Sequence, residues 1–191
     1  MKKKRVGVLI SGTGSNMKAL VAAGRAEGSP FEICCVVSNK PDAGGIAWAR
    51  ENGIATHVIS HKGYATREDF DAALNFYLKS QNLDLIACAG FMRIMTSTLI
   101  SPWQGRMVNI HPSLLPNYKG LHTHERVIAD GGTSHGCTVH YVTAELDDGP
   151  IIAQAFVPVL PGDSPDLLAA RVLVEEHKLY PEALAKVARE I

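Results

Sequence analysis

Three side chains in this sequence, Asn109, His111 and Asp147, have types that suit catalysis at a carbonyl group. An amide beside an imidazole can stabilise a developing oxyanion while the imidazole moves a proton. A carboxylate near that imidazole would raise the pKa of His111 and favour its charged form. The alternative makes Asn109 a turn residue, His111 a surface histidine and Asp147 part of an ordinary Asp-Asp-Gly turn. Taken singly, these residues favour the alternative; together with the loop described next, they favour catalysis.

A glycine-rich segment, Gly12-Thr13-Gly14-Ser15-Asn16, links the first expected strand to the first expected helix. Glycines let the backbone approach an anion, and the start of a helix offers free N–H groups. A dinucleotide fingerprint would need glycine where the chain has Met17, and a P-loop would need a lysine that is absent. The loop therefore favours a single phosphate group over a pyrophosphate. The alternative is a tight turn that binds nothing.

Asn109 and His111 follow directly on the apolar residues of an expected buried strand, 107–110. Ligands of open parallel sheets bind beyond the carboxyl ends of the strands. Alternation along the strand puts both side chains on one side, and Pro112 keeps His111 out of a helical conformation. We therefore expect the site at this edge of a sheet.

The elements that must position these residues alternate between apolar runs and amphipathic helical patterns. This order predicts an α/β fold: an open, mostly parallel twisted sheet with helices on both faces, Rossmann-like, and an antiparallel hairpin near the C-terminal end. We expect Pro165 to begin the last helix and Pro181 to kink or split it. Strands are expected at 6–10, 31–37, 56–59, 83–87, 107–110, 138–142 and 151–157.

Composition indicates an ordinary folded protein. The chain has 191 residues, 46% hydrophobic and 20% charged, so we expect residues 1–191 to form one domain. A formal net charge of zero disfavours nucleic acid and anionic membranes as partners. The sequence has neither an apolar run of membrane-spanning length nor a signal peptide, and its four cysteines include no Cys-x-x-Cys. We expect a soluble cytoplasmic protein with reduced thiols, either a monomer or a homodimer.

Several histidines and one cysteine lie close together in the sequence and raise the question of a metal site: His122, His124, His135, Cys137 and His140. The sequence has no His-Glu-x-x-His pair, and a helix would direct residues 122 and 124 apart. We therefore expect no metal.

With these motifs in place, the chain resembles the folate-dependent formyltransferase family, and within it the members that act on glycinamide ribonucleotide. The likeness covers nearly the whole length, with two departures: Thr13 where the family often has Asn, and Asp148 where it often has Gly. The motifs that carry it are Ile10-Ser11-Gly12-Thr13-Gly14-Ser15-Asn16, Ala89-Gly90-Phe91-Met92-Arg93-Ile94, the segment from Asn109 to Pro116, Gly120-Leu121-His122-Thr123-His124, and Glu145-Leu146-Asp147-Asp148-Gly149-Pro150.

The resemblance implies transfer of the formyl group of 10-formyltetrahydrofolate to the amine of 5'-phosphoribosylglycinamide in purine biosynthesis. It implies that Asn109, His111 and Asp147 are catalytic. It also implies that Gly14, Ser15, Asn16 and Glu176 bind the ribonucleotide. The implied folate-binding residues are Arg67, Met92, Arg93, Ile94, Met95, Asn109, Thr143, Ala144, Glu145, Leu146 and Asp147. Without the resemblance, Met92 and Ile94 would be interpreted as core residues and Arg67 as a solvated helix charge.

Three other functions stay open at this point. A formyltetrahydrofolate hydrolase could use similar residues, although the resembling hydrolases usually carry an additional N-terminal domain. Transfer-RNA formylation is disfavoured by the zero net charge and by the expected lack of a second C-terminal domain. A binding module for a sugar phosphate would keep the glycine loop but would have no use for Asn109, His111 and Asp147.

Overall fold

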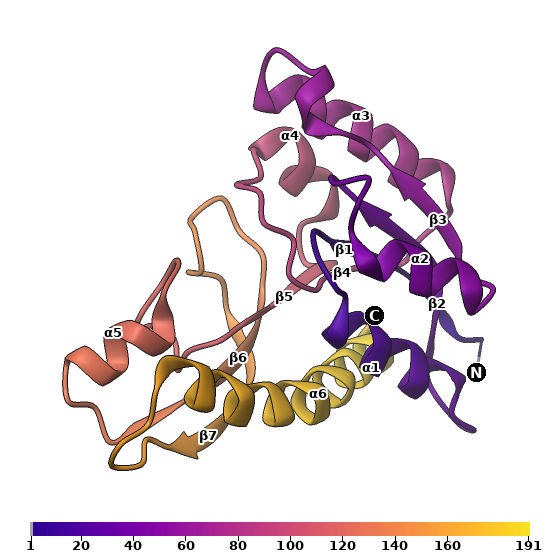
Figure 1. The fold of residues 1–191 in the computed structure, drawn as a ribbon. Coiled ribbons are helices and arrows are strands. Elements are labelled where there is room, and N and C mark those ends of the chain that lie inside the picture. The colour runs from indigo at the N-terminus through magenta and orange to yellow at the C-terminus, as the bar shows by residue number, and fades with distance from the viewer. Residues whose placement is uncertain (1) are drawn as a thin grey trace.

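The structure, a computed structural model, describes residues 2–191 and is built on one seven-stranded sheet in the order β3-β2-β1-β4-β5-β6-β7 (Figure 1). Strands β1 to β5 pair in parallel, whereas β5–β6 and β6–β7 pair antiparallel. This topology confirms the predicted fold class. The strands are β1 Lys4–Ile10, β2 Phe31–Ser38, β3 Ala55–Val58, β4 Leu85–Cys88, β5 Met107–His111, β6 Ser134–Tyr141 and β7 Ile151–Pro158.

The longest helices begin at capping side chains that the sequence supplies. Thr66 accepts a hydrogen bond from Asp69 N at the start of α3, and Ser164 accepts one from Leu167 N at the start of α6. Such caps satisfy backbone N–H groups that the helix itself leaves free. The helices are α1 Ser15–Arg25, α2 Gly44–Glu51, α3 Arg67–Ser80, α4 Ser97–Ile100, α5 Thr123–Ala129 and α6 Pro165–Glu190, with short 3-10 turns η1 His61–Gly63 and η2 Ser101–Trp103.

The two faces of the sheet are covered by different helices (Figure 1). Buried side chains of α1, α2 and α6, such as Leu20, Ile46 and Leu184, pack on one face. Side chains of α3 and α4, such as Leu74 and Leu99, pack on the other. Because helices cover both faces of the sheet, the central strands are largely apolar and show no regular alternation with polar residues.

The strand order changes direction between β1 and β4, which are neighbours in the sheet but not in the sequence. The segments that follow these two strands therefore diverge and leave a crevice at the carboxyl end of the sheet. Residues 12–16 after β1, together with Ala89 and Gly90 after β4, line an open pocket there. The fold thus places the glycine-rich loop at the topological switch point, the position between β1 and β4 where the strand order reverses.

Helix α6 continues through Pro181 as one helix, so of the two predicted effects of this proline the split does not occur. Proline removes one backbone donor from the helix. On either side of it, Tyr180 and Leu184 are fully buried in the core, and this packing holds the helix together. The Tyr180 hydroxyl also lies 2.8 Å from the carbonyl oxygen of Cys88, a hydrogen bond that ties α6 to the end of β4.

Two further expectations concern reduced thiols and the lack of a membrane-spanning segment. All four cysteines are free, and Cys35, Cys88 and Cys137 are buried. Burial raises the pKa of each of these three thiols to about 12. Among residues 2–191, no helix combines the length and the apolar character needed to cross a membrane.

Candidate active site

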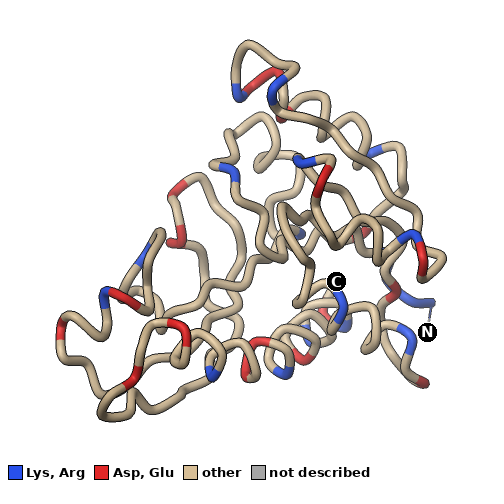
Figure 2. Tube along the Cα trace, in the orientation of Figure 1, with Lys and Arg blue, Asp and Glu red and all other residues tan. Residues whose placement is uncertain are grey.

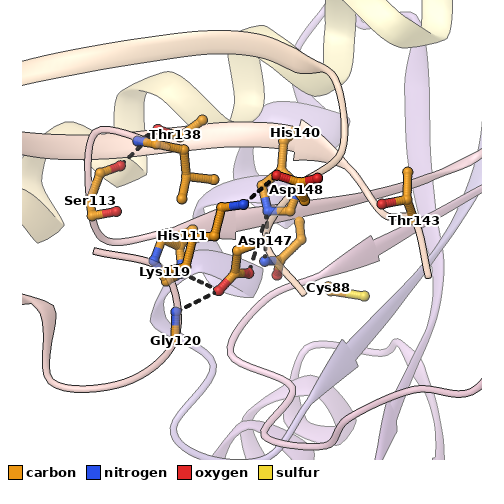
Figure 3. Close-up of polar contacts among 12 residues, drawn as sticks. Cys88, His111, Ser113, Lys119, Gly120, Thr138, His140, Thr143, Asp147 and Asp148 are labelled. Carbon is orange, nitrogen blue, oxygen red and sulfur yellow. Dashed lines mark hydrogen bonds and ion pairs between the residues drawn. The ribbon is translucent and has the colours of Figure 1, made fainter. Parts of the chain in front are cut away.

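The structure brings His111 and Asp147 together although they are far apart in the sequence. Nδ1 of His111 lies 3.4 Å from Oδ2 of Asp147, and both side chains are at least nine-tenths buried. His111 ends β5, whereas Asp147 lies in the turn between β6 and β7 (Figure 3). Because β5 and β6 are antiparallel, β6 ends opposite Val108 near the start of β5, and the turn that follows it reaches back to bring Asp147 to the imidazole.

Asp147 has a backbone conformation that aspartate tolerates better than most residues. Its φ is 50°, in the left-handed region, where Asp and Asn are enriched because their short polar side chains can bond locally. Oδ2 of Asp147 accepts a hydrogen bond of 2.9 Å from Gly120 N. A buried carboxylate needs such donors; the Gly120 amide supplies one, and a protonated His111 ring would supply a second (Figure 3).

The other ring nitrogen of His111 also faces an acceptor. Nε2 lies 2.9 Å from the carbonyl oxygen of Tyr118, which can only accept, so Nε2 carries a proton. A second proton on Nδ1 would point to Asp147. The ring is therefore held in one orientation by contacts at both nitrogens.

Asn109 is fixed by His140, its direct partner across the β5–β6 pair. His140 Nδ1 lies 2.9 Å from the Tyr141 carbonyl oxygen and donates to it. Burial lowers the pKa of His140, so its ring is neutral and Nε2 accepts from Asn109 Nδ2 at 3.2 Å. This bond uses one of the two N–H groups of Asn109 and sets the orientation of its amide. The second N–H stays available to a ligand.

The segment 118–120 joins the site to the turn that carries Asp147. The Tyr118 carbonyl contacts His111, and the Gly120 amide contacts Asp147. Between them, Lys119 forms an ion pair with Asp148. Asp148 is one of the two departures from the family pattern, and its carboxylate thus gains a partner across the site. The pair is partly exposed, so its contribution to stability is modest.

Gly149 packs against backbone where no side chain fits. A Cβ at this position would lie 1.7 Å from the carbonyl oxygen of Tyr141. Gly149→Ala must therefore push the turn away from β6 and displace Asp147, two residues earlier. Because misplacing a catalytic group by about 1 Å can cost about a hundredfold in rate, we expect kcat to fall by tenfold to about a hundredfold.

Steady-state kinetics of the purified variant measure this loss. Gly63→Ala is the matched control, because a Cβ on Gly63 meets nothing within 4 Å and its φ is not positive. The control should keep wild-type kcat. A Gly149→Ala variant with wild-type kcat would contradict the prediction that this turn positions a catalytic Asp147.

The glycine-rich loop has the geometry of an anion site. Helix α1 begins at Ser15 with no side-chain cap and with no acidic residue in its first turn, so its first N–H groups and positive dipole end are open to a ligand. Gly14 has a φ of 72°, and a Cβ there would lie 2.7 Å from Met17 Cε. Glycine is therefore required at the position where the loop turns into the helix.

Asn16 and Glu176 meet beside this loop. Nδ2 of Asn16 donates to Oε2 of Glu176 at 2.7 Å, and both residues are buried. Burial raises the pKa of Glu176, and the hydrogen bond from Asn16 opposes that shift. Oδ1 of Asn16 has no hydrogen-bond partner among residues 2–191. This pair brings α6 to the side of the crevice that the glycine-rich loop lines.

The implied folate-binding residues come from three segments near the α3 face of the sheet. Arg67 begins α3 and is exposed, and the guanidinium of Arg93 lies over the Phe70 ring of the same helix, 5.2 Å from its centroid. Met95 and Val142 pack against the same apolar cluster. The third segment is the turn Thr143, Ala144, Glu145, Leu146 and Asp147 that follows Val142.

Apolar side chains in these segments are exposed rather than buried. Met92 is 61% exposed, Ile94 54% and Leu146 57%. The interpretation of Met92 and Ile94 as core, which the sequence pattern alone would give, is therefore wrong. Exposed apolar side chains gathered near polar groups are typical of a surface that a ligand covers.

The histidines considered as metal ligands separate into different environments. His140 belongs to the Asn109 contact, whereas His124 Nδ1 lies 3.0 Å from His135 Nε2. Burial lowers the pKa of His124, and it lowers that of His135 to about 4. No group of three or more potential metal-binding side chains of suitable geometry is found among residues 2–191.

The chain is similar to known proteins over most of its length. Residues 4–184 match the family described as Formyl transferase, and the chain belongs to that family. The chain is 49% identical over 186 residues to the trifunctional purine biosynthetic protein adenosine-3 of Drosophila melanogaster; the match covers 96% of this chain and 14% of that protein. It therefore spans only a small part of the trifunctional relatives.

Shorter relatives are covered over four-fifths of their length or more. The phosphoribosylglycinamide formyltransferase of Escherichia coli strain K12 is 47% identical over 174 residues, 91% of this chain and 82% of that protein. The crystal structure of phosphoribosylglycinamide formyltransferase from Brucella melitensis superposes with a TM-score of 0.94 at 51% identity, covering 98% of this chain and 96% of that one.

Proposed function

We propose that this chain transfers the formyl group of 10-formyltetrahydrofolate to the amine of 5'-phosphoribosylglycinamide, a step of purine biosynthesis. The single observation that carries the proposal is the convergence of His111, Asp147 and Asn109 at the carboxyl end of β5, on the same edge of the sheet as the glycine-rich loop that follows β1. Membership of the formyl transferase family and the names of the relatives support the same reaction.

The proposed mechanism begins when the amine attacks the formyl carbon and forms a tetrahedral intermediate. The free N–H of Asn109 stabilises the negative oxygen. Protonated His111, held by Asp147, stabilises the same charge and gives its Nδ1 proton to the departing folate nitrogen, while the proton that the attacking amine loses passes to the imidazole in its place. The ring keeps its orientation throughout because the Tyr118 carbonyl holds Nε2.

The two substrates would approach from opposite sides of the crevice. Gly14, Ser15 and Asn16 would hold the phosphate, and Glu176 would contact the rest of the ribonucleotide. The formyl folate would lie against Arg67, the loop from Met92 to Met95 and the turn that leads into Asp147. Exposed Met92, Ile94 and Leu146 could make apolar contacts with the ring faces of the folate.

A direct assay tests the proposal and separates it from its rivals. Protein is mixed with 10-formyltetrahydrofolate, with and without the ribonucleotide, and loss of the formyl group is followed. Loss that depends on the amine supports the transferase. Loss without the amine would indicate a hydrolase, and no loss would indicate a binding module; either result would contradict the proposal.

We further propose one domain over residues 1–191, which acts on small molecules in the cytoplasm as a monomer or a homodimer and binds neither nucleic acid nor membranes. Basic and acidic residues are interspersed along the chain rather than segregated (Figure 2). This distribution supports the expectation against nucleic acid, because such partners favour a continuous basic surface. Chelator-treated protein that stays active would support the expectation of no metal.

A further inference from the structure

A buried aspartate on α3, outside the catalytic set, holds the end of the segment 92–96. Asp71 is 1% exposed. Its Oδ2 accepts hydrogen bonds from Thr96 N at 2.6 Å and from Thr96 Oγ1 at 2.8 Å. A carboxylate is costly to bury unless donors satisfy it, so this contact is specific and not incidental.

The other end of the same segment is held from a different element. Met92 N donates to Oγ of Ser11 at 2.8 Å, and that hydroxyl donates to Oδ1 of Asn39 at 2.5 Å. Ser11 and Asn39 are both buried. The loop 92–95 is therefore fixed at both ends by buried side chains, although it contains neither helix nor strand.

Helix α3 supplies more than the anchor to this loop. The Arg93 guanidinium lies over the ring of Phe70, the residue before Asp71. Burial raises the pKa of Asp71, and both the bonds from Thr96 and the nearby Arg93 charge oppose that shift. Arg67 lies four residues before Asp71, hence on the same side of the helix. The Asp71–Thr96 contact thus sets the distance between Arg67 and the loop 92–95.

We propose that Asp71 is a positioning residue that fixes the loop 92–95 on α3 and so shapes the surface that receives the formyl folate. The inference rests on the proposed function and extends it to a residue that touches neither substrate. A purely structural role, as a cap for helix α4, would lower stability but would not select between the two substrates.

Asp71→Ala should raise the KM for 10-formyltetrahydrofolate by about tenfold, because a hydrogen bond to a charged group is lost and the loop end is released. The KM for the ribonucleotide and kcat should stay near wild type. Asp71→Asn keeps an acceptor oxygen but loses the charge, so its effect should be smaller. Steady-state kinetics with each substrate varied in turn measure the three constants.

Two further readouts do not depend on turnover. Amide hydrogen exchange of residues 92–96 should accelerate in Asp71→Ala. The affinity for tetrahydrofolate, measured by calorimetry, should fall with the rise in KM. Should Asp71→Ala fail to fold, Thr96→Val removes only the hydroxyl bond and should shift the same constants in the same direction, whereas Thr96→Ser should keep wild-type values.

Asp84→Ala is the matched control, since Oδ2 of Asp84 accepts a backbone bond of 2.7 Å from Arg5 at the amino end of the sheet. It should lower stability without changing either KM. An unchanged folate KM in Asp71→Ala, or an equal rise in both KM values, would overturn the inference. No amine-dependent formyl loss in the wild-type protein would contradict the proposed function instead.

Discussion

His111→Ala is expected to lower kcat by about a hundredfold to ten-thousandfold, the range typical of a lost general acid or base. The imidazole is held at one nitrogen by a carboxylate, 3.4 Å away on Asp147, and at the other by a carbonyl oxygen, 2.9 Å away on Tyr118. Alanine removes the proton donor and leaves both acceptors without their partner. Steady-state kinetics at saturating concentrations of both substrates measure the loss.

Affinity for the ribonucleotide should be nearly unchanged in this variant, because its phosphate would bind at residues 14–16 and not at the imidazole. Calorimetric titration with the ribonucleotide checks this. His57→Ala is the control, since His57 lies in β3 at the far edge of the sheet and stacks on Tyr77. Near-normal kcat in His111→Ala would defeat the assignment.

His111 and Asp147 should also act as one catalytic unit. If Asp147 acts through His111, the double variant His111→Ala/Asp147→Ala should be hardly slower than His111→Ala alone, since groups that act together are strongly non-additive. If the fold-losses in kcat of the two single variants multiplied in the double variant, Asp147 would have a role separate from His111.

Much of the sheet could be predicted from sequence because the rule behind it is local. A strand covered on both faces is apolar throughout, and runs such as 6–10 and 107–110 meet that rule. Strand β6 was predicted too short because it begins with polar residues and Gly136. A Cβ on Gly136 would lie 1.9 Å from the Ala155 carbonyl oxygen, so glycine is required there by β7, which no local pattern reveals.

The candidate catalytic residues could also be predicted from sequence, but not all of the residues that hold the site in place. His140 depends on the register that sets Asn109 opposite it and on the irregularity between Val139 and His140 in the pairing with β7. Asp71 lies on an amphipathic helix and in sequence is typical of a solvated charge. Both contacts join distant segments, and only folding brings them together.

Asn109 carries the second large effect. Asn109→Ala should lower kcat by about a hundredfold to a thousandfold, the cost of removing one oxyanion donor. Ribonucleotide binding should again stay nearly intact. The measurement is kcat together with calorimetric affinity, as for His111.

Asn109→Asp gives a sharper test because it preserves size and removes both N–H groups. A carboxylate there would repel the developing oxyanion and would add a second negative charge beside His140 Nε2, which Oδ1 of Asp147 already approaches to 3.8 Å. We therefore expect Asn109→Asp to be slower than Asn109→Ala, although it is the closer isostere. His140→Ala should give a smaller loss than either, since it frees the amide to rotate but leaves its donors. If Asn109→Asp were as fast as wild type, the oxygen of the intermediate would have to be stabilised elsewhere.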